Sequence, residues 1–361
     1  MLDDPATTDA GLLDNARRYY GEALGSTADL RTNACATVEA PAPAVRAALA
    51  RVHPDVRARY YGCGLVAPEA IEGLRVLDLG CGAGQDAFVL AQLVGEQGEV
   101  VGVDATPAQL DVARRWRDWH ALEAGYARPN TRFLEGDIAR LDALELEPAS
   151  FDLIVSNCVI NLVADKAAVF RAAHRLLKAG GEMYFADVYA DRRVPADWLA
   201  DPVLHGECLA GALYWGDFLA AARAAGFLDP RLVHDRPISI TDPAIATRLE
   251  GIGFWSATWR LFRLNGLEPA CEDYGQAVRY HGTIPGHEAR MALDKHHVFE
   301  AGRVVPVCGN SWRMLAETRF APHFSCIGDT SRHYGIFAGF GDACPFGPAH
   351  ASDATATAGC C

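Results

Sequence analysis

A glycine-rich loop near residue 80 constrains the fold of this chain more than any other feature. The loop reads Asp78-Leu79-Gly80-Cys81-Gly82-Ala83-Gly84, and it follows Arg75–Leu79, a short apolar run typical of a buried strand. Glycine lets the backbone turn tightly and approach a ligand closely. A strand, a glycine turn and a helix in this order predict the first unit of a parallel sheet with a ligand site at the turn.

Strand and helix patterns alternate from residue 73 to about residue 190. At these lengths the alternation predicts an α/β fold, a parallel sheet with helices on both faces. Thr106 and Pro107 fit the N-cap and first position of one helix, and Gly180-Gly181 fits the end of another. The expected strands are Arg75–Leu79, Glu99–Val103, Thr131–Leu134, Phe151–Ser156 and Glu182–Ala186, and the expected helices are Ala87–Leu93, Thr106–Glu123 and Lys166–Lys178.

Acidic and sulfur-containing residues follow the ends of the predicted strands. Asp104, Asp137, Cys158 and Asp187 all fall at such ends. Ligand sites in sheets of this kind lie beyond the carboxyl ends of the strands. We therefore expect these side chains to gather around one ligand site near the glycine loop.

The chain divides into four expected segments. Residues 1–72 are expected to be helical, and residues 73–264 to hold the sheet, with helices over 190–225. Residues 265–350 are expected to form a small α+β domain, and 351–361 a flexible tail of small and polar residues. The later strands are expected at Arg231–Asp235, Ser256–Leu264, Ala277–His281 and His297–Phe299.

Charge and cysteine content narrow the class of protein. The formal net charge of the 361 residues is -13, which repels nucleic acid and anionic membranes, so neither is an expected partner. No apolar run approaches the ~20 residues of a membrane span, and the first residues do not resemble a signal peptide, so a cytoplasmic location is expected. In a reducing compartment the 11 cysteines are expected to be free, catalytic or ligating.

The spacing of the glycine loop favours S-adenosylmethionine as the cofactor. A nucleotide fingerprint for NAD would need glycine at position 85, where this chain has Gln85. Asp104 is suited to accept hydrogen bonds from both ribose hydroxyls and Asp137 from the adenine amino group, while Ile138 packs on the ring. A NAD-binding sheet or a fold that binds nothing are the alternatives. The expected cofactor residues are Tyr61, Asp78, Gly80, Gly82, Gly84, Asp104, Ala105, Asp137, Ile138 and Asn157.

Cysteines in polar or glycine-rich contexts suggest a soft substrate beside this cofactor. Cys158 ends a predicted strand, Cys63 lies in a glycine turn, and Cys208 follows the sheet strands. Three thiolates suit trivalent arsenic, whose lone pair can attack the sulfonium methyl group without a general base. Taken singly, each cysteine is expected to be a buried structural thiol. A zinc site is not expected, because no paired C-x-x-C spacing occurs.

Several motifs together resemble the arsenite S-adenosylmethionine methyltransferases. The resemblance extends from about residue 19 to residue 264 and more weakly to about residue 328. It implies a class I methyltransferase fold, which is Rossmann-like. It rests on Thr32-Asn33-Ala34-Cys35, Tyr60-Tyr61-Gly62-Cys63-Gly64, Val76-Leu77-Asp78-Leu79-Gly80, Ser156-Asn157-Cys158-Val159-Ile160-Asn161-Leu162, Gly206-Glu207-Cys208-Leu209 and Ala212-Leu213-Tyr214-Trp215.

The resemblance also implies roles for the cysteines. Cys158 and Cys208 would hold arsenic throughout, Cys63 would be the third ligand, and Cys35 would form a disulfide with Cys63 during turnover. A thiol reductant (glutathione, thioredoxin or a similar dithiol) would then reset that disulfide. The implied activity is transfer of methyl groups to arsenite, giving mono- and dimethylated arsenicals for arsenic detoxification. A monomer is expected.

Two other functions remain open at this point. A methyltransferase acting on carbon, oxygen or nitrogen of a small organic molecule would leave the three cysteines unexplained. A non-catalytic arsenic-binding protein would not need an intact cofactor site. Several further residues are expected to be structural: Cys81, Cys308, Cys326, Cys344, His296 and His297, while Cys360-Cys361 either captures arsenite or has no function.

Overall fold

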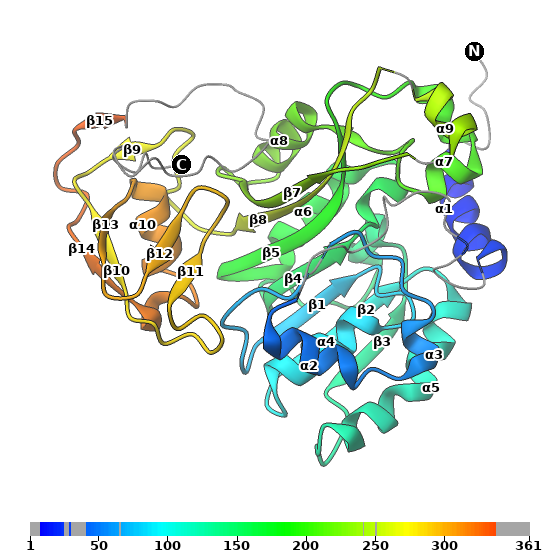
Figure 1. Cartoon of the computed structure of the whole chain (residues 1–361), viewed down its shortest axis with the longest axis horizontal. Coiled ribbons are helices and arrows are strands. Elements are labelled where there is room, and N and C mark those ends of the chain that lie inside the picture. Colours follow the sequence, from blue (N-terminus) through cyan, green and yellow to red (C-terminus); the bar gives the residue numbers. More distant parts are fainter. Residues whose placement is uncertain are drawn as a thin grey trace.

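The computed structural model of the chain describes residues 8–24, 29, 41–64, 66–240, 242–249 and 251–336. Among them, eight strands form one sheet in the order β3-β2-β1-β4-β5-β8-β7, with β6 paired to β5 (Figure 1). The strands are β1 Arg75–Leu79, β2 Glu99–Asp104, β3 Thr131–Glu135, β4 Phe151–Asn157, β5 Leu177–Ala190, β6 Leu213–Tyr214, β7 Arg231–Pro237 and β8 Phe254–Phe262.

The sheet is parallel where the sequence predicted a parallel sheet. Strands β1 to β5 pair in parallel, whereas β8 pairs antiparallel with β5, and β7 pairs antiparallel with β8. Almost every residue of β1, β2 and β4 is buried on both faces, as expected for strands covered by helices on either side. The class I methyltransferase fold expected from the sequence is therefore confirmed.

Two apolar clusters cover the two faces of the sheet. Alternate residues of β1 point to opposite faces, so that Val76 joins one cluster and Leu77 the other. One face packs against α2 Pro43–Ala50, α4 Gln85–Val94 and α5 Pro107–Glu123. The other face packs against the helices α6 Lys166–Leu176 and α8 Trp215–Ala224 and the 3-10 helix η4 Ile138–Ala143.

The glycine pair after α6 does not end that helix, contrary to the sequence prediction. The helix ends at Leu176 and the chain passes directly into β5, so Gly180 and Gly181 lie inside a strand. Gly180 has a φ of +78°, and a Cβ there would lie 2.6 Å from the Glu317 carbonyl oxygen. Glycine is required here because a distant segment packs against the strand backbone.

The segments flanking the sheet are less helical than predicted. Before the sheet, the described residues of 58–74 contain no helix, and they carry the turn around Cys63. After β5, short helices alternate with loops and β6. The helices outside the sheet layers are α1 Asp9–Arg18, the π-helix η2 Tyr19–Ala23, α3 Pro54–Arg57, η5 Ile160–Leu162, η6 Ala196–Ala200, α7 Pro202–Gly206 and α9 Pro243–Arg248.

The C-terminal part has its own small core. Three small sheets, β13-β10-β14, β11-β12 and β15-β9, surround one helix (Figure 1). This arrangement matches the α+β character expected there. Its elements are β9 Glu272–Asp273, β10 Ala277–Tyr280, β11 Arg290–Ala292, β12 Val298–Glu300, β13 Val304–Pro306, α10 Gly309–Ala316, η7 Ala321–His323, β14 Phe324–Ile327 and β15 Gly335–Ile336.

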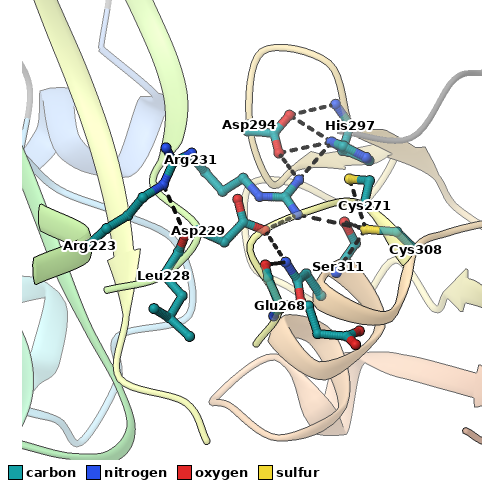
Figure 2. Close-up of polar contacts among 11 residues, drawn as sticks. Arg223, Leu228, Asp229, Arg231, Glu268, Cys271, Asp294, His297, Cys308 and Ser311 are labelled. Carbon is teal, nitrogen blue, oxygen red and sulfur yellow. Dashed lines mark hydrogen bonds and ion pairs between the residues drawn. The ribbon is translucent and has the colours of Figure 1, made fainter. Parts of the chain in front are cut away.

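A buried ion cluster joins β7 to this C-terminal part, as Figure 2 shows. The Arg231 guanidinium donates to Asp229 at 2.6 Å and to Asp294 at 3.1 Å, and Asp294 also accepts from His297 at 2.8 Å. Burial raises the pKa of Asp294, but His297 and Arg231 outweigh that effect and hold the pKa well below its usual range. His297 is therefore structural, as predicted.

Arg231→Met tests how much this cluster stabilises the fold. Removing the guanidinium leaves the half-buried Asp229 carboxylate without its cation and the buried Asp294 carboxylate with His297 alone, so we expect the free energy of unfolding to fall by about 3–5 kcal/mol. Urea denaturation followed by circular dichroism measures the change. The matched control is Arg193→Met, which breaks an exposed ion pair with Asp217 and should change nothing measurable. Equal stability of the two variants would contradict the stabilising role.

Candidate functional site

A cleft opens beyond the carboxyl ends of β1, β2 and β4. This is where ligands bind in open parallel sheets. Nine of the ten residues that the sequence assigned to the cofactor line it: Tyr61, Asp78, Gly80, Gly82, Asp104, Ala105, Asp137, Ile138 and Asn157. The tenth, Gly84, is the N-cap of α4 with a φ of +91°, and a Cβ there would lie 3.0–3.2 Å from side chains of the sheet and helix layers. Gly84 therefore serves the packing of α4.

Asp104 fixes the shape of the glycine loop. Its Oδ2 accepts a hydrogen bond from the backbone N–H of Gly82 at 2.9 Å, and its Oδ1 accepts from that of Thr106 at 2.7 Å. Burial raises the pKa of Asp104, although these hydrogen bonds favour the carboxylate. Each carboxylate oxygen keeps a further lone pair, so the side chain can still accept from ribose hydroxyls.

Asp78 places an unsatisfied carboxyl oxygen in the cleft. Among the described residues, its Oδ2 has no hydrogen-bond partner although it is fully buried. Burial, followed by the charges of Asp86 and Asp104, raises the pKa of Asp78 well above its usual value. A cation or N–H donor from a ligand would satisfy this oxygen. S-adenosylmethionine carries an ammonium group and ribose hydroxyls, so the donors and acceptors of this cleft fit that cofactor.

Gly80 is required by a close approach to the loop that follows β4. Its φ is +74°, and a Cβ there would lie 2.4 Å from the side chain of Val159. No other residue type satisfies both conditions. The loop glycine thus lets the residues after β4 pack directly against the cofactor cleft.

Three cysteines from separate segments meet beside this cleft. Cys158 follows β4, Cys208 follows α7, and Cys63 lies in the turn before the sheet. The Cys208 thiol donates to the carbonyl oxygen of Cys158 at 3.2 Å, and Cys63 is covalently joined to Cys158. All three are at most 2 % exposed. Their sulfur atoms form a buried cluster from positions 95 and 50 residues apart in the chain.

Two of these cysteines have a strained backbone. Cys158 has a φ of 57° and Cys208 a φ of 62°, in the left-handed region that side chains rarely adopt. Within the described part of the chain, only two other non-glycine residues, Ala70 and Ala149, have positive φ. Such strain persists only where the surrounding structure imposes it, and it concentrates at functional sites.

The pairing of cysteines differs from the sequence prediction. The sequence favoured free thiols, with Cys63 pairing to Cys35 during turnover, whereas the structure joins Cys63 to Cys158 with Cα atoms 5.8 Å apart. Cys35 lies outside the described residues. The two sulfurs of a disulfide are not thiolates, so this bond has to be reduced before both can bind a soft ion.

Asn157 has a role that sequence reasoning missed. Its Oδ1 accepts hydrogen bonds from the backbone N–H groups of Cys63 at 2.9 Å and Gly64 at 3.2 Å. Its Nδ2 donates to Tyr60 and to Asp86, both at 2.8 Å. Asn157 therefore ties the Cys63 turn to the end of β4 and to the first turn of α4. No local sequence pattern signals this, because the bonded residues lie more than 70 positions away.

Asp187 and Lys166 also lie beside the sulfur cluster. Asp187 does not end its strand as predicted, because β5 continues to Ala190. Burial raises the pKa of Asp187 to about 7 despite backbone hydrogen bonds and the charge of Lys166. Burial lowers the pKa of Lys166 to about 8, while Asp187 and Cys208 act in the opposite direction. The signal for Asp187 in the sequence was its place near a strand end.

The other cysteines lie away from the cluster or outside the described residues. Burial, followed by the charges of Asp104 and Asp78, raises the pKa of the Cys81 thiol well above its usual value, so Cys81 is a neutral packing residue. Cys308 is buried next to Arg231 (Figure 2), and Cys326 is half-buried on β14. Cys344, Cys360 and Cys361 lie outside the described residues.

Comparisons with known proteins agree with this geometry. A family model described as "Methyltransferase domain" matches residues 71–226, and one described as "Arsenite methyltransferase C-terminal domain" matches residues 274–335. The chain is 57% identical to an arsenite methyltransferase of Aquipseudomonas alcaligenes over 96% of this chain and 99% of that protein. It is 45% identical to that of Mus musculus over 86% of this chain and 82% of that protein.

A solved structure has the same overall fold. It is the crystal structure of CrArsM, an arsenic (III) S-adenosylmethionine methyltransferase from Chlamydomonas reinhardtii. The TM-score is 0.80 at 52% sequence identity, over 82% of this chain and 100% of that one.

Asn157→Ala tests whether this side chain holds the Cys63 turn. Loss of hydrogen bonds that contribute about 0.5–1.5 kcal/mol each should raise the exchange rates of the Cys63 and Gly64 amides by about 10-fold. Hydrogen exchange of the native protein measures these rates. The control is Asn130→Ala, whose side chain bonds Ala91 and Gly95 instead and should leave both amides unchanged. Unaltered exchange in Asn157→Ala would show that other contacts hold the turn.

Proposed function

This chain belongs to the family of S-adenosylmethionine-dependent arsenite methyltransferases, and we propose that Cys63, Cys158 and Cys208 hold the arsenic that it methylates. The observation that carries the proposal is the sulfur cluster beside the cofactor cleft. Cys158 lines that cleft and lies in the same cluster as the other two sulfurs. A thiolate set of this kind suits a soft ion such as trivalent arsenic.

Different residues of the cleft bind different groups of the cofactor. Asp78 accepts from the ammonium group, Asp104 from the ribose hydroxyls and Asp137 from the adenine amino group, while Ile138 packs against the adenine ring. S-adenosylmethionine supplies an electrophilic methyl group on a sulfonium centre. Asn157 acts on the substrate side, because it positions the Cys63 turn through backbone hydrogen bonds.

The cysteines make a general base unnecessary. Three thiolates satisfy the bonding of trivalent arsenic and leave its lone pair as the nucleophile, which carries no proton to remove. The left-handed backbone of Cys158 and Cys208 fixes where their thiols point. Burial of all three sulfurs keeps water from competing for the methyl group.

A disulfide cycle accompanies this transfer in our proposal. Cys63 forms a disulfide with Cys35 during turnover, and the two electrons released keep the methylated arsenic trivalent; an external thiol reductant such as thioredoxin or glutathione then reduces the disulfide. The disulfide between Cys63 and Cys158 supports the idea that Cys63 changes sulfur partners. The products are mono- and dimethylated arsenicals, and the cellular role is arsenic detoxification by a cytoplasmic monomer.

The two competing functions have less support. A methyltransferase acting on an organic acceptor needs an organic pocket in place of the three buried sulfurs. A non-catalytic arsenic-binding protein does not need the intact cleft that nine of the expected cofactor residues line.

None of the described helices has the length and hydropathy required to cross a membrane.

Formation of S-adenosylhomocysteine by the reduced protein tests the function. We expect the product only when both S-adenosylmethionine and arsenite are present, because the sulfur cluster selects the acceptor. In Cys158→Ser we expect the rate to fall to background, because a hydroxyl is a hard and protonated ligand. Liquid chromatography of the reaction measures the product.

The matched control for that experiment is Cys326→Ser. Cys326 is half-buried on β14 and away from the cleft, so its replacement should leave the rate unchanged. Arsenite-dependent turnover that persists in Cys158→Ser would exclude the thiolate mechanism. Binding of S-adenosylmethionine without arsenite-dependent turnover would favour another acceptor.

Cys35→Ser tests the disulfide cycle separately. We expect the first methylation, from arsenite, to be lost more completely than the second, from methylated trivalent arsenic. Without Cys35, Cys63 has no partner for the disulfide of the cycle, and Cys63 is a ligand that only arsenite needs, whereas methylated arsenic is held by Cys158 and Cys208 alone. Separate assays with the two arsenicals give the ratio of rates. An equal loss of both steps would count against the cycle.

A further inference from the structure

A carboxylate completes the sulfur cluster, and the arsenic chemistry has no use for it. One ligand atom each from Cys158, Cys208 and Asp187 lies within 4.8 Å of the other two, and all three residues are buried. Asp187 comes from β5, whereas Cys158 follows β4 and Cys208 follows α7. The sequence predicted no zinc site because the cysteines lack short paired spacing, but the fold assembles a donor set from residues far apart in the chain.

The Asp187 carboxylate is held in place before any ion binds. Its Oδ1 accepts from the backbone N–H of Val188 at 2.8 Å, and its Oδ2 accepts from that of Asn161 at 3.1 Å. Each oxygen has a further lone pair, so these bonds orient the carboxylate without using up its capacity as a ligand. A buried, oriented carboxylate beside two thiols is a site for a cation.

We propose that the reduced protein also binds one thiophilic divalent cation, of which zinc is the example, through Cys63, Cys158, Cys208 and Asp187. The proposal shares three cysteines with the proposed arsenic site and to that extent rests on the proposed function. Binding of the cation excludes arsenic, because both ions need the same sulfurs. The enzyme is therefore inhibited by such cations in competition with arsenite and not with S-adenosylmethionine.

Trivalent arsenic and zinc prefer different coordination geometries. Trivalent arsenic takes three thiolates in a pyramid and needs no fourth donor, whereas zinc takes four donors in a tetrahedron. Bond lengths of about 2.3 Å to sulfur and about 2.1 Å to oxygen give donor separations of roughly 3.5–3.8 Å in a tetrahedron. The donors at up to 4.8 Å therefore have to move together by about 1 Å. Reduction of the bond to Cys158 frees Cys63 as the remaining donor.

The net charge of the occupied site also differs between arsenic and zinc. Three thiolates neutralise trivalent arsenic, which leaves the Asp187 carboxylate to interact with the nearby Lys166 ammonium. A zinc ion carries two positive charges, and three thiolates carry three negative charges. The charges of Asp187 and Lys166 offset each other. One negative charge then remains, and the need for a fourth donor comes from the tetrahedral coordination of zinc and not from this charge. Asp187 is thus essential for zinc and dispensable for holding arsenic.

Direct zinc binding to the full chain tests the proposal. Metal-free protein, reduced with a phosphine, competes with a chromophoric chelator for zinc, and we expect one zinc ion per chain. Stoichiometric arsenite should prevent this uptake in the wild-type protein. Asp187→Asn should weaken zinc binding at least 10-fold, because a direct ligand is lost. Its arsenite binding is measured as protection of Cys208 from alkylation. This binding should stay within about 3-fold of wild type, because trivalent arsenic needs only the three thiolates.

Controls make each outcome decisive. Asp217→Asn, at an exposed carboxylate that pairs with Arg193, should bind both ions as the wild type does. The proposal is overturned if the wild type binds no zinc while arsenite still protects Cys208, or if Asp187→Asn binds zinc as tightly as the wild type. Should Asp187→Asn fail to fold, the proposal is also overturned if arsenite protects Cys208 of the wild type but does not displace its zinc. Zinc uptake without arsenite protection would instead support the cation site and remove the proposed arsenic site.

Discussion

The hydrogen bonds between the Asn157 side chain and the backbone of Cys63 and Gly64 hold the two halves of this site together. Asn157 ends β4, so its place follows from the parallel pairing of β4 with β1 and β5. The turn it holds belongs to a segment that contributes no strand to the sheet. Because the same amide also donates to Asp86 at the start of α4, the sulfur cluster and the cofactor cleft share one support.

Buried ion pairs connect the segments that surround the site. Arg260 on β8 forms ion pairs at 2.8 Å with Glu69, in the segment after the Cys63 turn, and with Glu182 on β5. Arg319 of the C-terminal part also pairs with Glu182. Breaking one partner of such a cluster leaves an uncompensated buried charge, which is strongly unfavourable. The C-terminal part is thus attached to the strand and segment that position the substrate side.

The sulfur cluster combines strain with burial. Two of its cysteines have left-handed backbone conformations, and the residues around them exclude water. A site built in this way holds its thiols in a fixed arrangement before a ligand arrives, which reduces the entropy lost on binding. The same preorganisation admits any ion whose ligand preference the donor set meets, so selectivity depends on the number of donors and on charge.

The sequence alone determined the strands and the cofactor cleft, because those depend on local patterns. Apolar runs located β1 and β4, and glycine spacing located the loop whose φ values require glycine. The short sequence motifs around Cys63, Cys158 and Cys208 also identified these cysteines as candidate arsenic ligands. Only the tertiary structure decided that Asn157 binds the Cys63 turn and that Gly180 serves a contact with Glu317. These contacts join residues far apart in the chain, and packing of the whole fold, not any local pattern, brings them together.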